Sequence, residues 1–265
     1  MFDLTDNVAV VTGGASGNGR AIALAFADHG AAVVVADLQA EPREGGTPTH
    51  EVIAEEADGR AEFVECDVTS VADLEAAVDA AEAFGGVDTM VNNAGIIRDE
   101  VFTEVDEAAY EQIMDVNVKG AFFGSQVAVE RMAENGGGSI VNISSTSGLV
   151  GSNSSVTYST SKGAVRLMTY AIAAQYGGAG IRANAIHPGA VRTELVREDL
   201  GFDYDDEEAL AAVTHKIPDG RLADPDDIAN AAVYLASDYA SHVNAESLVV
   251  DGGQVNTDTP AGWGR

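Results

Sequence analysis

The sequence predicts an α/β fold: an open, doubly wound, mostly parallel sheet of seven strands, with helices on both faces. Two observations predict it. Short apolar runs alternate with helical patterns from one end of the chain to the other. The apolar runs are continuous, which is typical of parallel strands that helices cover on both faces. No internal repeat or linker divides the chain, so we expect residues 1–265 to form one domain.

Seven apolar runs are the expected strands. In chain order they are Val8–Val11, Ala32–Ala36, Phe63–Cys66, Val87–Val91, Ser139–Ile143, Arg182–Ile186 and Leu248–Val250. Alanine-rich or amphipathic segments between them predict helices, of which the clearest are Arg20–His29, Ala72–Phe84 and Ser155–Tyr176.

Two stretches depart from this alternation. Glu41–Thr49 carries two prolines and two glycines and predicts a loop. Thr193–Gly220 is acidic and irregular, and it is too long for an ordinary connection, which suggests a lid over a substrate site. We interpret the acidic run at its centre, residues 203–208, as solvated surface and not as a cation site.

The charge of the chain is strongly negative. There are 43 Asp and Glu against 14 Lys and Arg, which gives a net charge of −29. Nucleic acid and anionic membranes would repel such a surface, so we expect neither as a partner. The only lysines are Lys119, Lys162 and Lys216. Acidic excess with few lysines is typical of proteins from salt-accumulating halophiles, and an acidic mesophilic protein is the alternative.

Composition also bounds the location and the chemistry. No run approaches the roughly 18 apolar residues of a membrane span, and the first six residues do not resemble a signal peptide, so we expect a cytoplasmic protein. The single cysteine, Cys66, allows no internal disulfide and is expected to be a small buried residue. No metal is expected, because metal-ligand spacing is missing from the histidines His29, His50, His187, His215 and His242.

A glycine-rich turn between the first strand and the first helix predicts a dinucleotide site. Residues 12–19 are Thr-Gly-Gly-Ala-Ser-Gly-Asn-Gly, which permits a tight turn and close approach of a pyrophosphate to the helix N-terminus. Asp37 ends the second strand, where a carboxylate binds the adenosine ribose hydroxyls and repels a 2′-phosphate. No Arg or Lys lies between Arg20 and Arg43. We therefore expect NAD as the cofactor, and not NADP.

Seven motifs follow one another along the chain: the glycine turn, Asp67-Val68, Asn92-Asn93-Ala94-Gly95, Asn117, Ile143-Ser144-Ser145, Tyr158-Ser159-Thr160-Ser161-Lys162 and Pro188–Thr193. In this order they resemble the short-chain dehydrogenase/reductase family, in its short single-domain branch, over essentially the whole chain. Asn18 departs from the apolar residue usual in that family. The resemblance implies a Rossmann fold with cofactor contacts from Gly13, Ser16, Gly17, Asn18, Gly19, Asp37, Asp67, Val68, Asn93, Ala94, Gly95, Tyr158, Lys162, Pro188, Gly189, Val191 and Thr193.

Tyr158 and Lys162 are the candidate catalytic pair. Positions four apart share one face of a helix, so the two side chains are expected to be neighbours. A nearby ammonium favours the phenolate and lowers the pKa of a tyrosine from about 10 toward the working pH of a general base. We expect Tyr158 to take the hydroxyl proton as hydride leaves for NAD+, and to return it in reduction.

The resemblance assigns the remaining catalytic roles. Ser145 is expected to hydrogen-bond the substrate oxygen where charge develops. We prefer it to Ser144 and Ser147 because the family serine lies 13 positions before the tyrosine. Asn117 is expected to anchor a water that relays protons from Lys162, and Lys162 to hold the nicotinamide ribose hydroxyls.

The expected function is NAD(H)-dependent hydride transfer to or from a secondary alcohol or carbonyl, with sugar, polyol, secondary-alcohol and 3-oxoacyl substrates all open. The many acidic residues of Thr193–Gly220 favour a neutral polyol or sugar. The alternative is a non-catalytic NAD-binding sensor or scaffold, against which the complete set of catalytic candidates argues. An epimerase or dehydratase of the longer branch fits poorly, because no extra C-terminal substrate domain is expected. By resemblance, we expect a homotetramer or a dimer.

Overall fold

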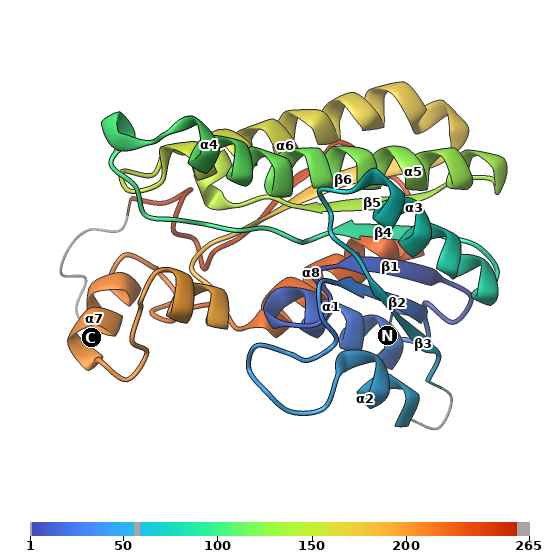
Figure 1. The fold of residues 1–265 in the computed structure, drawn as a ribbon, viewed down its shortest axis with the longest axis horizontal. Helices are drawn as coiled ribbons and strands as arrows, with labels where there is room; N and C mark the ends of the chain where they lie inside the picture. Colours follow the sequence, from blue (N-terminus) through green and yellow to red (C-terminus); the bar gives the residue numbers. More distant parts are fainter. Residues whose placement is uncertain (1, 56–58, 259–265) are drawn as a thin grey trace.

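The computed structural model describes residues 2–55 and 59–258. Its seven strands form one sheet in the order β3-β2-β1-β4-β5-β6-β7, and every neighbouring pair is parallel. Helices cover both faces of the sheet (Figure 1). The predicted doubly wound α/β fold is confirmed, and the sheet is parallel throughout.

All seven predicted strands are present, with ends that differ from the prediction by at most two residues. They are β1 Val8–Thr12, β2 Ala32–Asp37, β3 Ala61–Glu65, β4 Thr89–Asn92, β5 Gly138–Ile143, β6 Ile181–Pro188 and β7 Ser247–Val250.

The three predicted helices correspond to α1, α3 and α6, and the structure adds others that the sequence pattern did not reveal. The helices are α1 Gly17–Asp28, α2 Thr49–Glu55, α3 Val71–Ala80, α4 Glu107–Met114, α5 Gly120–Glu134, α6 Val156–Tyr176, α7 Glu207–Thr214 and α8 Pro225–Ala236. The π-helical segment η3, Asp115–Lys119, joins α4 to α5. Within the described residues, no helix is both long enough and apolar enough to cross a membrane.

Successive strand residues face opposite helical layers. Val11 and Val33 belong to a core that includes residues of α1 and α8, whereas Val10 and Val34 belong to a core that includes residues of α3 and α5. Because both faces of β1 and β2 are buried, valine is favoured at every position, which explains the continuous apolar runs of the sequence. The sheet is thereby held rigidly, with its carboxyl end free to carry a site.

The segment after β6 is more ordered than the sequence suggested. Residues 193–220 contain the helix α7, which Asp206 caps, and a π-helical turn η6, Leu195–Asp199. The segment also has a small core of its own, centred on the buried side chains of Tyr204, Ile217 and Leu222. It lies beyond the end of the sheet in Figure 1. Our expectation of an irregular stretch was wrong. Its apolar residues are scattered among many acids and show no helical periodicity in the sequence, yet they form a local cluster in the structure.

Candidate active site

Two predicted cofactor motifs meet where β1 and β4 end. The strand order reverses between these neighbours, and in open parallel sheets ligands bind outside the carboxyl ends at such a point. The Asn93 side-chain amide donates hydrogen bonds to the carbonyls of Thr12 at 3.0 Å and Gly13 at 3.2 Å. The backbone N–H of Ala94 donates to the Thr12 hydroxyl at 3.2 Å. These contacts join the glycine turn and residues 93–95 into one wall.

Glycine is required at two positions of the turn. Gly13 has a φ of +64°, and a Cβ there would lie 2.8 Å from Nδ2 of Asn93. A Cβ on Gly19 would overlap the carbonyl of Gly13. The turn therefore carries no side chain at these two positions, as close approach of a pyrophosphate to the start of α1 requires.

Asp37 lies at the end of β2, as predicted, with its carboxylate turned toward the glycine turn. Oδ2 accepts a hydrogen bond from the N–H of Ala15 at 3.0 Å, and Oδ1 accepts one from the N–H of Leu38 at 2.8 Å. Burial raises the pKa of Asp37 above its usual value, and these backbone hydrogen bonds partly offset the rise. A half-buried carboxylate thus marks the adenosine end of the predicted site.

The predicted pair Asp67-Val68 follows β3. The Asp67 carboxylate accepts hydrogen bonds from both the N–H and the hydroxyl of Thr69, at 2.9 and 2.8 Å, so it stabilises its own turn. Val68 is buried, and Gly120 packs closely against it. The adenine contact of this pair stays a prediction.

The loop predicted over Glu41–Thr49 folds back over the glycine turn, which the sequence did not indicate. The N–H of Arg43 donates to Oγ of Ser16 at 2.8 Å. The N–H of Gly17 donates to Oε1 of Glu44 at 3.0 Å. A carboxylate of the protein itself therefore lies at the N-terminal end of α1, where the helix dipole favours negative charge.

Tyr158 and Lys162 lie on one face of α6, as predicted. The Nζ of Lys162 is 5.6 Å from the centroid of the Tyr158 ring and donates a hydrogen bond to the carbonyl of Ile143 at 2.9 Å. The Ser145 side chain lies close enough to the Tyr158 hydroxyl to lower its pKa. The structure thus brings the predicted tyrosine, serine and lysine together at the ends of β5 and α6.

Burial governs the acidity of this pair. It raises the pKa of Tyr158, and the nearby Ser145 side chain lowers it in part. Burial lowers the pKa of Lys162 to about 8. Our expectation that the pKa of Tyr158 falls below its usual value of about 10 was therefore wrong for this structure. Removal from water disfavours the charged form of each group, and burial is the largest cause of both shifts.

The contacts of the neighbouring serines differ. Ser144 is buried and donates to the carbonyl of Lys162 at 2.8 Å, which fixes α6 to the end of β5. Ser145 meets Tyr158 and accepts a hydrogen bond from the N–H of Ser147 at 3.1 Å. Of the two serines, only Ser145 has its side chain close to Tyr158, and its contact with the substrate oxygen stays a prediction.

Asn117 is buried within η3, and a π-helical segment inside a helix frequently marks a functional position. Its amide accepts from the N–H of Ile96 at 2.8 Å and donates to the carbonyl of Ile96 at 2.9 Å and to Ser161 at 3.1 Å. A Cβ on Gly95 would lie 3.3 Å from both Oδ1 of Asn117 and Nζ of Lys162. Gly95 thus joins the cofactor wall to the catalytic group.

His187 is fully buried beside Ser145. The sequence analysis said of this residue only that it shows no metal-ligand spacing. Its Nδ1 lies 2.9 Å from the Ser145 carbonyl, and its Nε2 lies 2.8 Å from Oγ of Ser247. The Ser247 hydroxyl lies 2.6 Å from the Tyr170 hydroxyl, which accepts from Nε of Arg166 at 2.9 Å. Every group in this series has its hydrogen bond if each donates to the next, from Arg166 through Tyr170, Ser247 and His187 to the Ser145 carbonyl.

The motif after β6 closes the opposite side of the site. Pro188 is the last residue of β6, Gly189 follows it, and Val191 is buried. Thr193 then lies against the glycine turn, because a Cβ on Gly17 would be 3.5 Å from its Cγ2. Segments that follow β1 and β6 therefore face each other across the predicted site.

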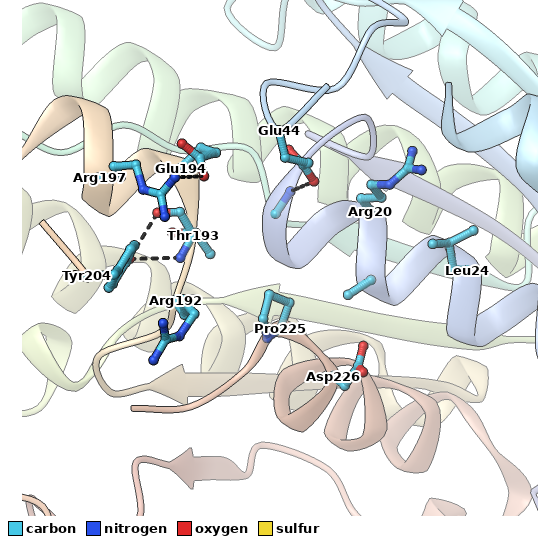
Figure 2. A pocket seen from close by; sticks show the side chains of 12 residues that line it. Arg20, Leu24, Glu44, Arg192, Thr193, Glu194, Arg197, Tyr204, Pro225 and Asp226 are labelled. Atoms are coloured by element: carbon cyan, nitrogen blue, oxygen red, sulfur yellow. Dashed lines mark hydrogen bonds and ion pairs between the residues drawn. The ribbon is translucent and has the colours of Figure 1, made fainter. Parts of the chain in front are cut away.

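A cavity of about 370 Å³ lies between the start of α1, the start of α8 and residues 192–204 (Figure 2). Tyr204 anchors the far wall: its hydroxyl accepts from the N–H of Thr193 and donates to the Thr193 carbonyl, both at 3.0 Å. The guanidinium groups of Arg192 and Arg197 lie 5.1 and 5.2 Å from its ring centroid. Glu44 lies on the opposite side.

These residues fit a nicotinamide dinucleotide. The glycine turn, which has no side chains at Gly13 and Gly19, allows a pyrophosphate to approach, and Asp37 matches a ribose diol. Asn18 carries a buried Oδ1 that has no hydrogen-bond partner among the described residues, which leaves an acceptor for a ligand at the start of α1. Fold and site together define a dinucleotide-dependent oxidoreductase.

The chain belongs to the short-chain dehydrogenase/reductase family. A family model described as enoyl-(acyl carrier protein) reductase matches residues 13–254. The chain is 40% identical to a 2,5-dichloro-2,5-cyclohexadiene-1,4-diol dehydrogenase of Sphingobium indicum, covering 94% of this chain and 96% of the relative. It is also 40% identical to a D-threitol dehydrogenase of Mycolicibacterium smegmatis, covering 95% and 94%.

Solved structures agree with this assignment. A short-chain type dehydrogenase/reductase from Mycobacterium marinum superposes with a TM-score of 0.88 at 33% identity, over 97% of this chain and 98% of the other. A structure from Beutenbergia cavernae, described as an NAD(P)-dependent gluconate 5-dehydrogenase with bound NADP at low occupancy, has a TM-score of 0.86 at 36% identity, over 97% and 99%. The protein is thus an oxidoreductase acting on alcohols, with a fold that binds a nicotinamide cofactor.

Proposed function

We propose that this protein is an NAD(H)-dependent dehydrogenase of secondary alcohols, with Tyr158 as its general acid and base. The observation that carries the proposal is that Tyr158 lies beside the buried Lys162, whose Nζ is 5.6 Å from its ring centroid, and close to the buried Ser145. A bound nicotinamide supplies the hydride acceptor in alcohol oxidation and the hydride donor in carbonyl reduction.

The protein's own groups handle the proton. With its pKa raised by burial, Tyr158 is protonated at neutral pH, ready to donate to a carbonyl oxygen in reduction. In oxidation Tyr158 first gives up its own proton to solvent, and its Oη, now a phenolate, accepts the substrate hydroxyl proton. The Ser145 hydroxyl donates a hydrogen bond to the substrate oxygen, where charge develops. Lys162, with a pKa of about 8, is mostly an ammonium at pH 7 and stabilises the phenolate. Asn117, which is buried and bonded to Ile96 and Ser161, is proposed to anchor a water that relays protons from Lys162.

The proposed preference for NAD rests on charge at the adenosine end. Asp37 presents a carboxylate at the end of β2, and Glu44 adds a second close enough to raise the pKa of Asp37. A 2′-phosphate would meet two negative groups there, whereas the two hydroxyls of an unphosphorylated ribose would meet hydrogen-bond acceptors.

The proposed substrate is a neutral polyol or sugar. Relatives at 40% identity include the D-threitol dehydrogenase and an L-rhamnose 1-dehydrogenase (NAD(P)(+)) of Azotobacter vinelandii. We propose that residues 193–220 form the lid of the substrate site within a single domain. The acidic surface of this segment favours an uncharged substrate over an anionic one.

Three further proposals concern the protein's surroundings. The charge of −29 supports a halophilic protein, whose melting temperature would rise steeply with KCl concentration. A cytoplasmic location is the second of these proposals. Phe122 of α5 and Leu167 of α6, 48% and 66% exposed, support a homotetramer or dimer built on this face. Light scattering after gel filtration measures that assembly.

The experiment that tests the function is growth of NADH absorbance, in molar KCl, with NAD+ or NADP+ and a panel of polyols, sugars and secondary alcohols. Tyr158→Phe is measured beside the wild type, and it is expected to lose turnover while it binds NADH nearly unchanged. Substantial turnover by Tyr158→Phe would refute the role of the tyrosine. Turnover with NADP+ alone would refute the cofactor preference.

A further inference from the structure

Residues 38–48, between β2 and α2, form a strap over the glycine turn. Its far end is fixed by Thr49, which is fully buried and donates its hydroxyl to the Gly14 carbonyl at 3.0 Å. The same hydroxyl accepts a hydrogen bond from Arg20 at 2.9 Å, so that guanidinium is already engaged. The middle of the strap is held by the contacts of Arg43 with Ser16 and of Glu44 with Gly17. The strap is thus tied to the predicted cofactor site along its length.

Arg43 is the only cation in the strap. Its Nε and Nη2 donate to Oε2 of Glu198 at 2.9 and 2.6 Å. Its Nη2 and Nη1 donate to Asp199 at 2.7 and 3.4 Å. Hydrogen bonds with Asp199, and then with Glu198, raise the pKa of Arg43 well above its ordinary value. All three guanidinium nitrogens are therefore occupied by carboxylates of η6, in the segment after β6.

This ion pair decides which charges face the adenosine end of the site. The Arg43 backbone meets Ser16, which is the neighbour of Ala15, whose N–H binds Asp37. An arginine whose backbone lies beside Ser16 is near enough in the chain to neutralise a 2′-phosphate beside Asp37 through a charge-assisted, bidentate contact. Held by Glu198 and Asp199, its side chain points to the substrate segment.

We propose that Glu198 and Asp199 are determinants of cofactor choice, because they hold Arg43 and leave the carboxylates of Asp37 and Glu44 to oppose a 2′-phosphate. This inference rests on the proposed nicotinamide-cofactor function of the site. It places part of the selection against NADP in the substrate segment, outside the strand end that carries Asp37.

The test is direct binding of NADH and NADPH, followed by nicotinamide fluorescence at one fixed KCl concentration, which needs no substrate. In the double variant E198Q/D199N, the Kd for NADPH is expected to fall about tenfold, since one charge-assisted contact is gained. The Kd for NADH is expected to change by less than about threefold. Adding R43Q to the double variant should remove the gain.

A matched control separates the ion pair from general charge. The variant D205N/E207Q also removes two negative charges, but from exposed positions of the same segment that are not partners of Arg43. It should leave the preference for NADH over NADPH within about twofold of wild type.

Equal gains in E198Q/D199N and D205N/E207Q, or a gain that survives R43Q, would overturn the inference. Tight NADH binding by all variants, with no gain in affinity for NADPH, would also overturn the inference, but it would leave the proposed function standing. A wild-type protein that binds neither nucleotide would overturn the proposed cofactor function itself, and the inference with it.

Discussion

His187→Phe tests whether a polar chain in the core fixes the reactive serine. The phenylalanine ring has a similar shape and lacks both nitrogens, so the variant loses the hydrogen bonds to the Ser145 carbonyl and to Ser247. Each partner keeps one other hydrogen bond, from Gly148 and with Tyr170 respectively. At about 1 kcal/mol for each lost bond, unfolding should become easier by about 2 kcal/mol. For a chain of this size, the melting temperature should fall by about 4–8 °C.

The destabilisation of His187→Phe should depend on pH. Burial lowers the pKa of His187 from 6.5, and the charges of Arg166 and Lys162 lower it further, although the Ser145 carbonyl partly opposes the shift. As pH falls below 6.5, the unfolded chain binds a proton at His187 that the folded protein does not, so the wild type loses stability. The variant lacks this loss. The difference between the two melting temperatures should therefore shrink from about pH 7.5 to about pH 5.5.

The assay is thermal unfolding followed by circular dichroism at matched KCl, with kcat measured on the same preparations. Replacement of the exposed His242 by Gln is the control, and it should change stability by less than about 0.5 kcal/mol. A lower kcat with an unchanged KM would show that the chain positions Ser145. A melting difference that stays constant with pH, or is no larger than that of the control, would refute the buried, neutral state of His187.

Four other variants test three separate parts of the site. Gly19→Ala should fail to give folded protein, because the added Cβ overlaps a backbone carbonyl. Gly17→Ala should lower the free energy of unfolding by only about 1–2 kcal/mol, because alanine is disfavoured at the positive φ of this position. Equal melting temperatures of the two variants would contradict this. Lys162→Met should abolish turnover yet stabilise the fold at pH 7 by on the order of 2 kcal/mol. The wild type buries a charged ammonium at this pH, and the free-energy cost of that burial is what lowers the pKa of Lys162 to about 8. That gain should disappear as pH rises from about 8 to about 10.5, and a destabilised variant in thermal unfolding would refute it. Glu44→Gln should lower the Kd for NADH threefold or more in a fluorescence titration, because a carboxylate leaves the start of α1; weaker binding would argue that Glu44 helps to hold the cofactor.

The sheet could be predicted because each strand carries its own signal. β1 and β2 are buried on both faces, so Val8–Thr12 and Ala32–Asp37 are apolar at nearly every position, and this pattern has no competing explanation. The sequence analysis missed the helices α4 and α8, although α8 buries Ile228, Ala229, Ala232, Val233, Leu235 and Ala236 on one apolar face. Their start signals, Asp106 and the capping box at Asp224, precede them in the sequence and could have been used.

The site could be predicted only as far as local motifs reach. A spacing of four placed Tyr158 and Lys162 on one face, but spacing contains no information on burial, and burial reverses the expected effect on the tyrosine pKa. Arg43 and Glu198 are 155 positions apart, so no pattern in the loop after β2 indicates their ion pair. A motif search finds residues that a ligand needs, whereas contacts between two ordinary loops come from the fold alone.

The strap also explains how so acidic a protein can present a site for an anionic dinucleotide. Two arginines near the site are paired with carboxylates of the protein: Arg43 with Glu198 and Asp199, and Arg197 with Glu194 at 3.3 Å. The dipole and N–H groups of α1, which are fixed by the backbone and independent of side-chain charge, then supply much of the attraction for phosphate. Because Glu44 satisfies one of those N–H groups, a cofactor phosphate replaces an existing contact rather than filling a bare one. Binding should therefore be less sensitive to salt than at a site built from arginines, and a steep loss of NADH affinity with rising KCl would contradict this argument.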